Sequence, residues 1–81
     1  MRSKNILVRA KKKKALASYQ AERYEEARIL YEEVCRVDRL DADARLMLGM
    51  IAGLRCEHQT AETYFRQALG LDPKLATAQF N

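Results

Sequence analysis

The stretch AETYFRQALGLDP, residues 61–73, spaces a small residue, an aromatic residue and an Ala-Leu pair at three- and four-residue steps before Asp-Pro. Steps of three and four place side chains on one face of a helix. Because proline cannot continue a helix, the pattern predicts an amphipathic helix that ends near residue 70. The stretch decides the fold because its pattern also occurs earlier in the chain.

Shifting the chain against itself by 34 residues, a known repeat period, aligns residues of similar kind. The aligned pairs are Ala15 with Gly49, Ala27 with Ala61, Tyr31 with Phe65, Val34 with Ala68, Cys35 with Leu69, Val37 with Leu71, Asp38 with Asp72, Ala42 with Ala76 and Ala44 with Ala78. An ordinary four-helix bundle would explain the apolar stripes but not these matches. The sequence therefore predicts a repeat array.

Helix-forming residues dominate, and the chain has only three glycines and one proline. Turn signals fall near 21–23, 38–41, 55–57 and 72–73, and no alternating pattern indicates a strand. We expect an all-α fold, an α-α superhelical repeat of two helix pairs plus the start of a third unit. The expected helices are 8–21, 24–37, 42–54 and 58–70, with a fifth after Pro73.

The pattern resembles the tetratricopeptide repeat family, which has Leu-Gly in its first helix and then Ala, an aromatic and Pro at fixed spacing. The resemblance implies an N-terminal extension at 1–7, repeat 1 at 8–41, repeat 2 at 42–75 and a truncated third repeat or capping helix at 76–81. In repeat 1, Ala15 replaces the glycine and Arg39 the proline. The implied structural anchors are Ala27, Tyr31, Leu48, Gly49, Ala61, Phe65, Ala68 and Pro73.

Both ends of the chain carry an expectation. Lys14 and Ser18 stand where the second unit has Leu48 and Ala52, so we expect them on the polar outer face of an N-terminal cap. The last residues begin a third unit, so we expect the chain to be part of a longer array. Asn81 matches an asparagine of arrays of the O-linked N-acetylglucosamine transferase type, and sulfotransferase arrays are a related possibility. Exposed apolar surface near Tyr64 and Leu71 predicts weak self-association.

No group of residues indicates catalysis, a cofactor or a metal site. Cys35 aligns with a core leucine, and Cys56 and His58 supply only two ligands where a metal needs about four. We therefore expect a protein that is not an enzyme. Two cysteines without Cys-x-x-Cys spacing indicate a reducing compartment, so we also expect a cytoplasmic protein. No apolar run approaches the roughly 18 residues of a membrane span.

The four lysines at 11–14 are the sharpest charge feature, in a chain of net charge +4. At about 100° per residue they encircle a helix rather than form one stripe, and no aromatic residues interleave with them to stack on bases. Nucleic-acid or anionic-surface binding is therefore the less favoured alternative.

The favoured function is that of a protein-interaction scaffold. In resembling proteins the first helix of each unit lines a groove that receives peptides, and the repeats can recruit substrates for an enzyme such as a glycosyltransferase. The partner would be a protein or peptide of unknown identity. The matching groove positions are Arg9, Lys12, Leu16, Tyr19, Gln20, Asp43, Leu46, Met50, Gly53 and Leu54.

Overall fold

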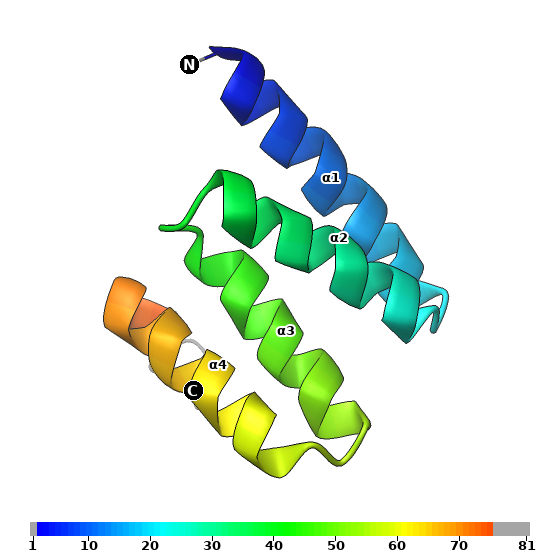
Figure 1. The fold of residues 1–81 in the computed structure, drawn as a ribbon, viewed down its shortest axis with the longest axis vertical. Coiled ribbons are helices and arrows are strands. Elements are labelled where there is room, and N and C mark those ends of the chain that lie inside the picture. The colour runs from blue at the N-terminus through cyan, green and yellow to red at the C-terminus, as the bar shows by residue number, and fades with distance from the viewer. Residues whose placement is uncertain (1, 76–81) are drawn as a thin grey trace. The chain divides into compact units, whose positions relative to one another are not determined.

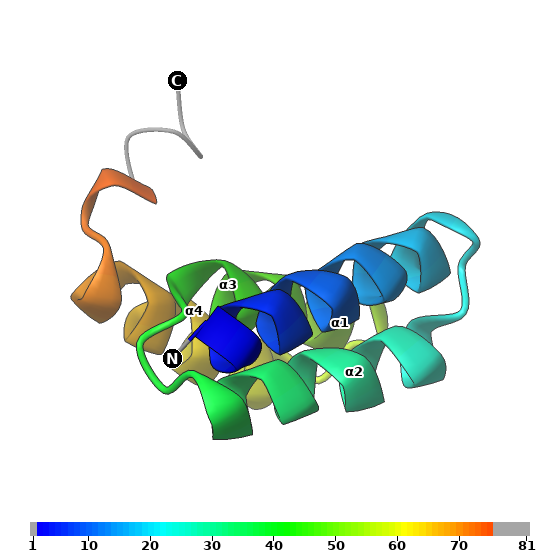
Figure 2. The same ribbon diagram turned by 90° about the horizontal axis from the view of Figure 1, so that it is seen from above.

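The computed structural model describes residues 2–75, and this range is built of helices without a strand. The helices are α1 (Arg2–Gln20), α2 (Tyr24–Val37), α3 (Ala42–Leu54) and α4 (His58–Leu71). α1 packs against α2 in unit 1, residues 1–39, and α3 packs against α4 in unit 2, residues 40–81. In each unit the chain reverses at a short turn, so the two helices run antiparallel (Figures 1 and 2). The all-α helical repeat fold is confirmed.

The helix bounds agree with the expected ones except at three ends. α2 and α3 are as expected, α4 extends one residue further, to Leu71, and α1 ends one residue earlier than expected, at Gln20. The expected start of α1 at residue 8 is wrong, since the helix begins at Arg2. No glycine or proline lies in 2–7, so the helix continues through residues that the family pattern does not require. Residues 76–81, with most of the expected fifth helix, lie outside the described range.

Local hydrogen bonds explain where α3 begins and where α4 ends. The carboxylate of Asp41 accepts a hydrogen bond from the backbone N–H of Ala44 at 2.9 Å, which caps the N-terminus of α3. After α4, the carboxylate of Asp72 accepts from the backbone N–H of Lys74 at 3.1 Å. The Asp-Pro pair thus ends α4 through a turn held by the Asp72 side chain.

The turn after α1 is a Schellman motif. The backbone N–H of Arg23 donates to the carbonyl of Ser18 at 2.8 Å, and that of Glu22 donates to Tyr19 at 3.0 Å. Glu22 has a φ of 62°, the left-handed conformation that this motif requires and glycine usually supplies. The sequence of this turn therefore does not predict its conformation, because glutamate stands where glycine is usual.

The turn after α3 repeats this geometry at the positions 34 residues on. Glu57 donates to Ala52 at 2.9 Å, Cys56 donates to Gly53 at 3.1 Å, and Cys56 has a φ of 61°. Two turns with the same hydrogen bonds and the same left-handed residue make the units repeats in backbone as well as in sequence.

The core of each unit consists mainly of small and aliphatic residues at helix-facing positions. In unit 1 the buried residues are Val8, Ala15, Ser18, Ala27, Tyr31 and Val34. In unit 2 they are Ala44, Leu48, Gly49, Ile51, Ala52, Ala61 and Ala68. Alanine and glycine let antiparallel backbones approach closely, and the few large side chains fill the remaining space. Six of the eight expected anchors are therefore buried.

The other two anchors, Phe65 and Pro73, differ from expectation. Pro73 is exposed, so its role is to end the helix rather than to pack. Phe65 is only half-buried, and its ring lies over Gly49: a Cβ built on Gly49 would meet the ring atom Cε1 at 2.7 Å. Phe65 thus lies at the margin of the contact between α3 and α4. The large side chains that are fully buried in the described part of unit 2 are Leu48 and Ile51.

The expected N-terminal cap is half right. Lys14 is exposed where unit 2 has the buried Leu48. Ser18, however, is only 5% exposed, and its hydroxyl donates to a carboxylate oxygen of Glu26 at 2.6 Å. The hydroxyl is satisfied inside unit 1, so Ser18 is a packing residue of the helix pair and not part of a solvated outer face.

Candidate functional site

The candidate functional surfaces are two, each described by itself: that of α1 in unit 1 and that of α3 in unit 2. On α1, Arg9, Leu16 and Gln20 are exposed, whereas Lys12 and Tyr19 are half-buried. The ring of Tyr19 meets that of Tyr24 edge to face, with centroids 5.6 Å apart. Tyr19 is therefore partly engaged in closing the turn of unit 1, which leaves Arg9, Leu16 and Gln20 as the accessible predicted residues of α1.

On α3 the predicted residues form an apolar stripe. Leu46, Met50 and Leu54 follow one another at four-residue steps and so lie on one helix face. Leu46 and Met50 are half-buried, and Leu54 is 54% exposed. Gly53 next to Leu54 is exposed, and a Cβ added to it would meet no atom within 4 Å. The predicted Asp43 is exposed at the start of the helix.

Polar bridges join the first and second helices at equivalent positions of the two units. The ammonium of Lys11 lies 2.8 Å from a carboxylate oxygen of Glu33, and the guanidinium of Arg45 donates to the amide oxygen of Gln67 at 2.7 Å. The two pairs stand 34 residues apart, so the repeat offset is the sequence signal that could have revealed them. Lys11 consequently belongs to the interior seam of unit 1 rather than to a free basic patch.

The Lys11 bridge changes the titration of Glu33. The hydrogen bond from Lys11, and then its positive charge, hold the pKa of the Glu33 carboxyl below its ordinary value. Arg36 and Lys14 add to this effect through their charges. The Lys11–Glu33 pair therefore joins α1 to α2 by a hydrogen-bonded ion pair.

A second ion-pair network runs along α2. Arg28 donates hydrogen bonds to Glu25 and, at 2.7 Å, to Glu32, one turn to either side. These bonds raise the pKa of the guanidinium above its already high ordinary value. Because each carboxylate is paired with an arginine one turn away, the pattern is that of a solvated helix face and not of an acid–base pair for catalysis.

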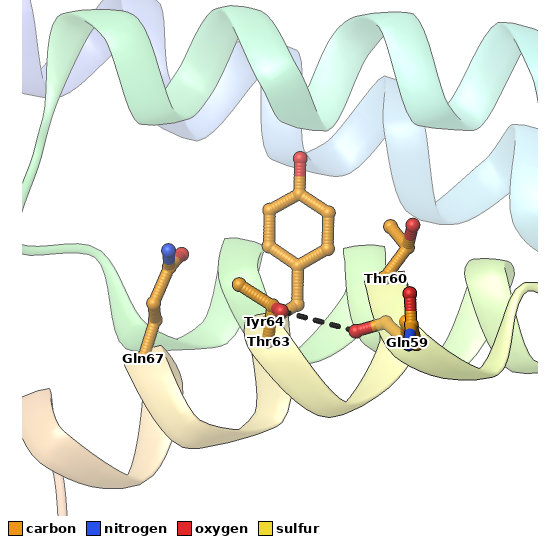
Figure 3. A pocket seen from close by; sticks show the side chains of 5 residues that line it. All are labelled: Gln59, Thr60, Thr63, Tyr64 and Gln67. Carbon is orange, nitrogen blue, oxygen red and sulfur yellow. Dashed lines mark hydrogen bonds between the residues drawn. The ribbon is translucent and has the colours of Figure 1, made fainter.

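Along α4 lies a hollow of about 410 Å³ lined by uncharged polar side chains (Figure 3). Its lining residues are Gln59, Thr60, Thr63, Tyr64 and Gln67. The Thr63 hydroxyl donates to the backbone carbonyl of Gln59 at 3.0 Å, so it is occupied by its own helix. The hollow offers hydrogen bonds but no nucleophile beside a base. Tyr64 is half-buried and Leu71 exposed, and self-association through them stays a prediction.

Within residues 2–75, no group of three His, Cys, Asp or Glu side chains is placed to hold a metal ion. Cys35 is half-buried and Cys56 exposed, and the two thiols are not joined in a disulfide. Over the same described range, none of the helices combines the length and the apolar character needed to cross a membrane.

A known family model matches the part of the chain that contains α3 and α4. The model described as tetratricopeptide repeat matches residues 42–75, which hold α3, its Schellman turn and α4. Residues 42–75 are thus similar to a tetratricopeptide repeat. Comparisons with curated proteins and with solved structures find no match. Tetratricopeptide repeats generally mediate protein–protein interactions, typically by binding proteins or peptides.

Proposed function

We propose that the chain is a non-catalytic protein-interaction module that binds peptide segments along α1 and α3. The observation that carries the proposal is the apolar stripe of Leu46, Met50 and Leu54 on the first helix of the tetratricopeptide repeat. An extended or amphipathic peptide recognises such a stripe by inserting side chains at matching spacing. A flexible methionine at its centre adapts to partners of different shape.

The energetic basis is burial of apolar surface on this stripe. Fully covering an exposed leucine contributes about 1.5–3 kcal/mol. Leu54 is 54% exposed, so covering the rest of it contributes about half of that, roughly fivefold to tenfold in affinity. Leu46 and Met50 are half-buried already and have less area to contribute. Leu54 is therefore the side chain of the stripe on which binding should depend most.

The finer proposal is that these repeats recruit substrates for an enzyme joined to them in a longer cytoplasmic protein. Its support is one position of the sequence pattern: Asn81 stands where arrays of the O-linked N-acetylglucosamine transferase type carry an asparagine. The cytoplasmic setting rests on the cysteine pattern of the sequence, which has two cysteines without Cys-x-x-Cys spacing. Identifying the residues that follow Asn81 in the encoded protein tests this proposal, because a glycosyltransferase or sulfotransferase domain must then be found there.

A binding experiment with matched leucine variants tests the proposed function. Leu54→Glu places a charge on the apolar stripe of α3, and Leu71→Glu changes an exposed leucine on α4 in the same way. With equal helicity by circular dichroism, Leu54→Glu should reduce the proteins captured from lysate by about tenfold, as lost burial of one leucine implies, and Leu71→Glu should reduce them little. Equal capture by both variants and the wild type would contradict peptide binding along α3.

A further inference from the structure

Charge is unevenly distributed between the two units. Residues 1–39 hold eleven lysines and arginines against six acidic residues, while residues 40–81 hold four against five. α1 itself carries seven basic residues and no acidic one. The excess positive charge of the chain therefore resides on one helix.

The basic residues of α1 differ in exposure and in pairing. Lys11 is half-buried and lies 2.8 Å from a carboxylate oxygen of Glu33 on α2, and Lys12 is half-buried as well. Arg9 and Lys13 are exposed and four residues apart. These two residues therefore present positive charge to solvent on one face of the helix.

Arg9 and Lys13 share a helix face with two exposed apolar side chains. Ile6, Arg9, Lys13 and Leu16 follow one another at steps of three and four residues, and we call them the basic-apolar stripe. Ile6 is 67% and Leu16 is 43% exposed. At about 100° per residue, the stripe lies opposite the buried Val8, Ala15 and Ser18, which face α2.

We propose that the basic-apolar stripe binds an acidic segment of a protein partner whose carboxylates alternate with apolar side chains. The carboxylates would meet Arg9 and Lys13, and the apolar side chains would cover Ile6 and Leu16. This inference rests on the proposed function and names the partner class of its α1 surface. Nucleic acid fits less well, because the stripe has no aromatic residue for base stacking and the nearby Tyr19 is packed against Tyr24.

Three fluorescent peptides and one oligonucleotide serve as probes in anisotropy titrations. The peptides alternate leucine with glutamate, leucine with lysine, or serine with glutamate, and the oligonucleotide is oligothymidine. The glutamate–leucine peptide should bind most tightly, and its affinity should fall as salt is added, because exposed charges are screened. Tighter binding of oligothymidine, or equal binding of the lysine–leucine peptide, would overturn the proposal.

Neighbouring lysines provide the matched variants. Lys13→Glu reverses a charge on the stripe, and Lys14→Glu reverses the adjacent charge about 100° around the helix. Turning one attraction into a repulsion should weaken glutamate–leucine binding about tenfold for Lys13→Glu. Lys14→Glu should weaken the binding of this peptide by at most about threefold, because its charge lies off the stripe. Lys13→Arg keeps the charge and should retain the binding. Equal losses in the Lys13→Glu and Lys14→Glu variants would mean a diffuse charge effect and overturn the stripe.

Backbone amide shifts separate failure of this inference from failure of the proposed function. With the glutamate–leucine peptide, the shifts should concentrate at Ile6, Arg9, Lys13 and Leu16. Shifts confined to α3 would overturn the stripe while leaving peptide binding by the repeat in place. If none of the three peptides changes the amide shifts of residues in α1 or α3, the acidic-partner inference fails. The proposed function then depends on the result of the Leu54→Glu experiment alone.

Discussion

Leu48→Ala is expected to lower the free energy of unfolding by about 2–5 kcal/mol, the range for emptying a buried leucine site. Leu48 is 2% exposed on α3 and is among the largest fully buried side chains. Ala44 and Ala52, one turn to either side on the same face of α3, are buried and too small to extend into the space that its loss would leave. Urea denaturation followed by circular dichroism measures the change.

Leu54→Ala is the matched control, because it makes the same chemical change on the same helix at a position that is 54% exposed. It should alter the free energy of unfolding by at most about 0.5 kcal/mol. If the two variants lost equal stability, Leu48 would not be a core residue and the packing of unit 2 would need revision.

Gly49→Leu should cost about 3 kcal/mol or more, since a well-packed crossing has no room for the added side chain. A Cβ at position 49 would meet Phe65 Cε1 at 2.7 Å and Cδ1 at 2.8 Å, closer than carbon atoms tolerate. Either the Phe65 ring must swing outward or α3 and α4 must separate. The same denaturation measurement gives the size of the loss.

Gly53→Leu, four residues further along α3, is the control for this change. Nothing lies within 4 Å of a Cβ at position 53, so the variant should be neutral or gain up to about 1 kcal/mol from helix propensity. Combining Gly49→Leu with Phe65→Ala should recover part of the loss, because the second change removes the clashing ring. Additive losses in the double variant would show that Phe65 is not what excludes a side chain at position 49.

The helix pairs were predictable because the 34-residue offset constrains many positions at once. The offset even aligns Ala15 with Gly49. The Ala15 methyl group is buried in unit 1, whereas a methyl group at position 49 of unit 2 would meet the Phe65 ring. The Schellman turns were not predictable in detail, since Glu22 and Cys56 stand where the left-handed conformation favours glycine. Their conformation follows from the hydrogen bonds of the turn, which overcome the local preference of the residue.

Side-chain exposure was the other quantity that the sequence could not supply. Phe65 and Tyr31 align, yet Tyr31 is 3% exposed and Phe65 only half-buried. Ser18 is of a residue type usually found at the surface but is buried, and its hydroxyl donates a hydrogen bond to the carboxylate of Glu26. The candidate site was located by the family pattern, while its division into an apolar stripe on α3 and a basic-apolar stripe on α1 depends on which side chains the fold leaves exposed.

Site-specific photo-crosslinking tests the central claim, protein binding along the first helices, most directly. A benzophenone side chain is placed at Leu16 of α1, at Leu54 of α3 or, as the control, at Ile29 of α2, which is as exposed as Leu16 at 43%. The account predicts protein adducts from positions 16 and 54 and few from position 29. Adducts formed mainly from position 29, or adducts with nucleic acid instead of protein, would contradict it.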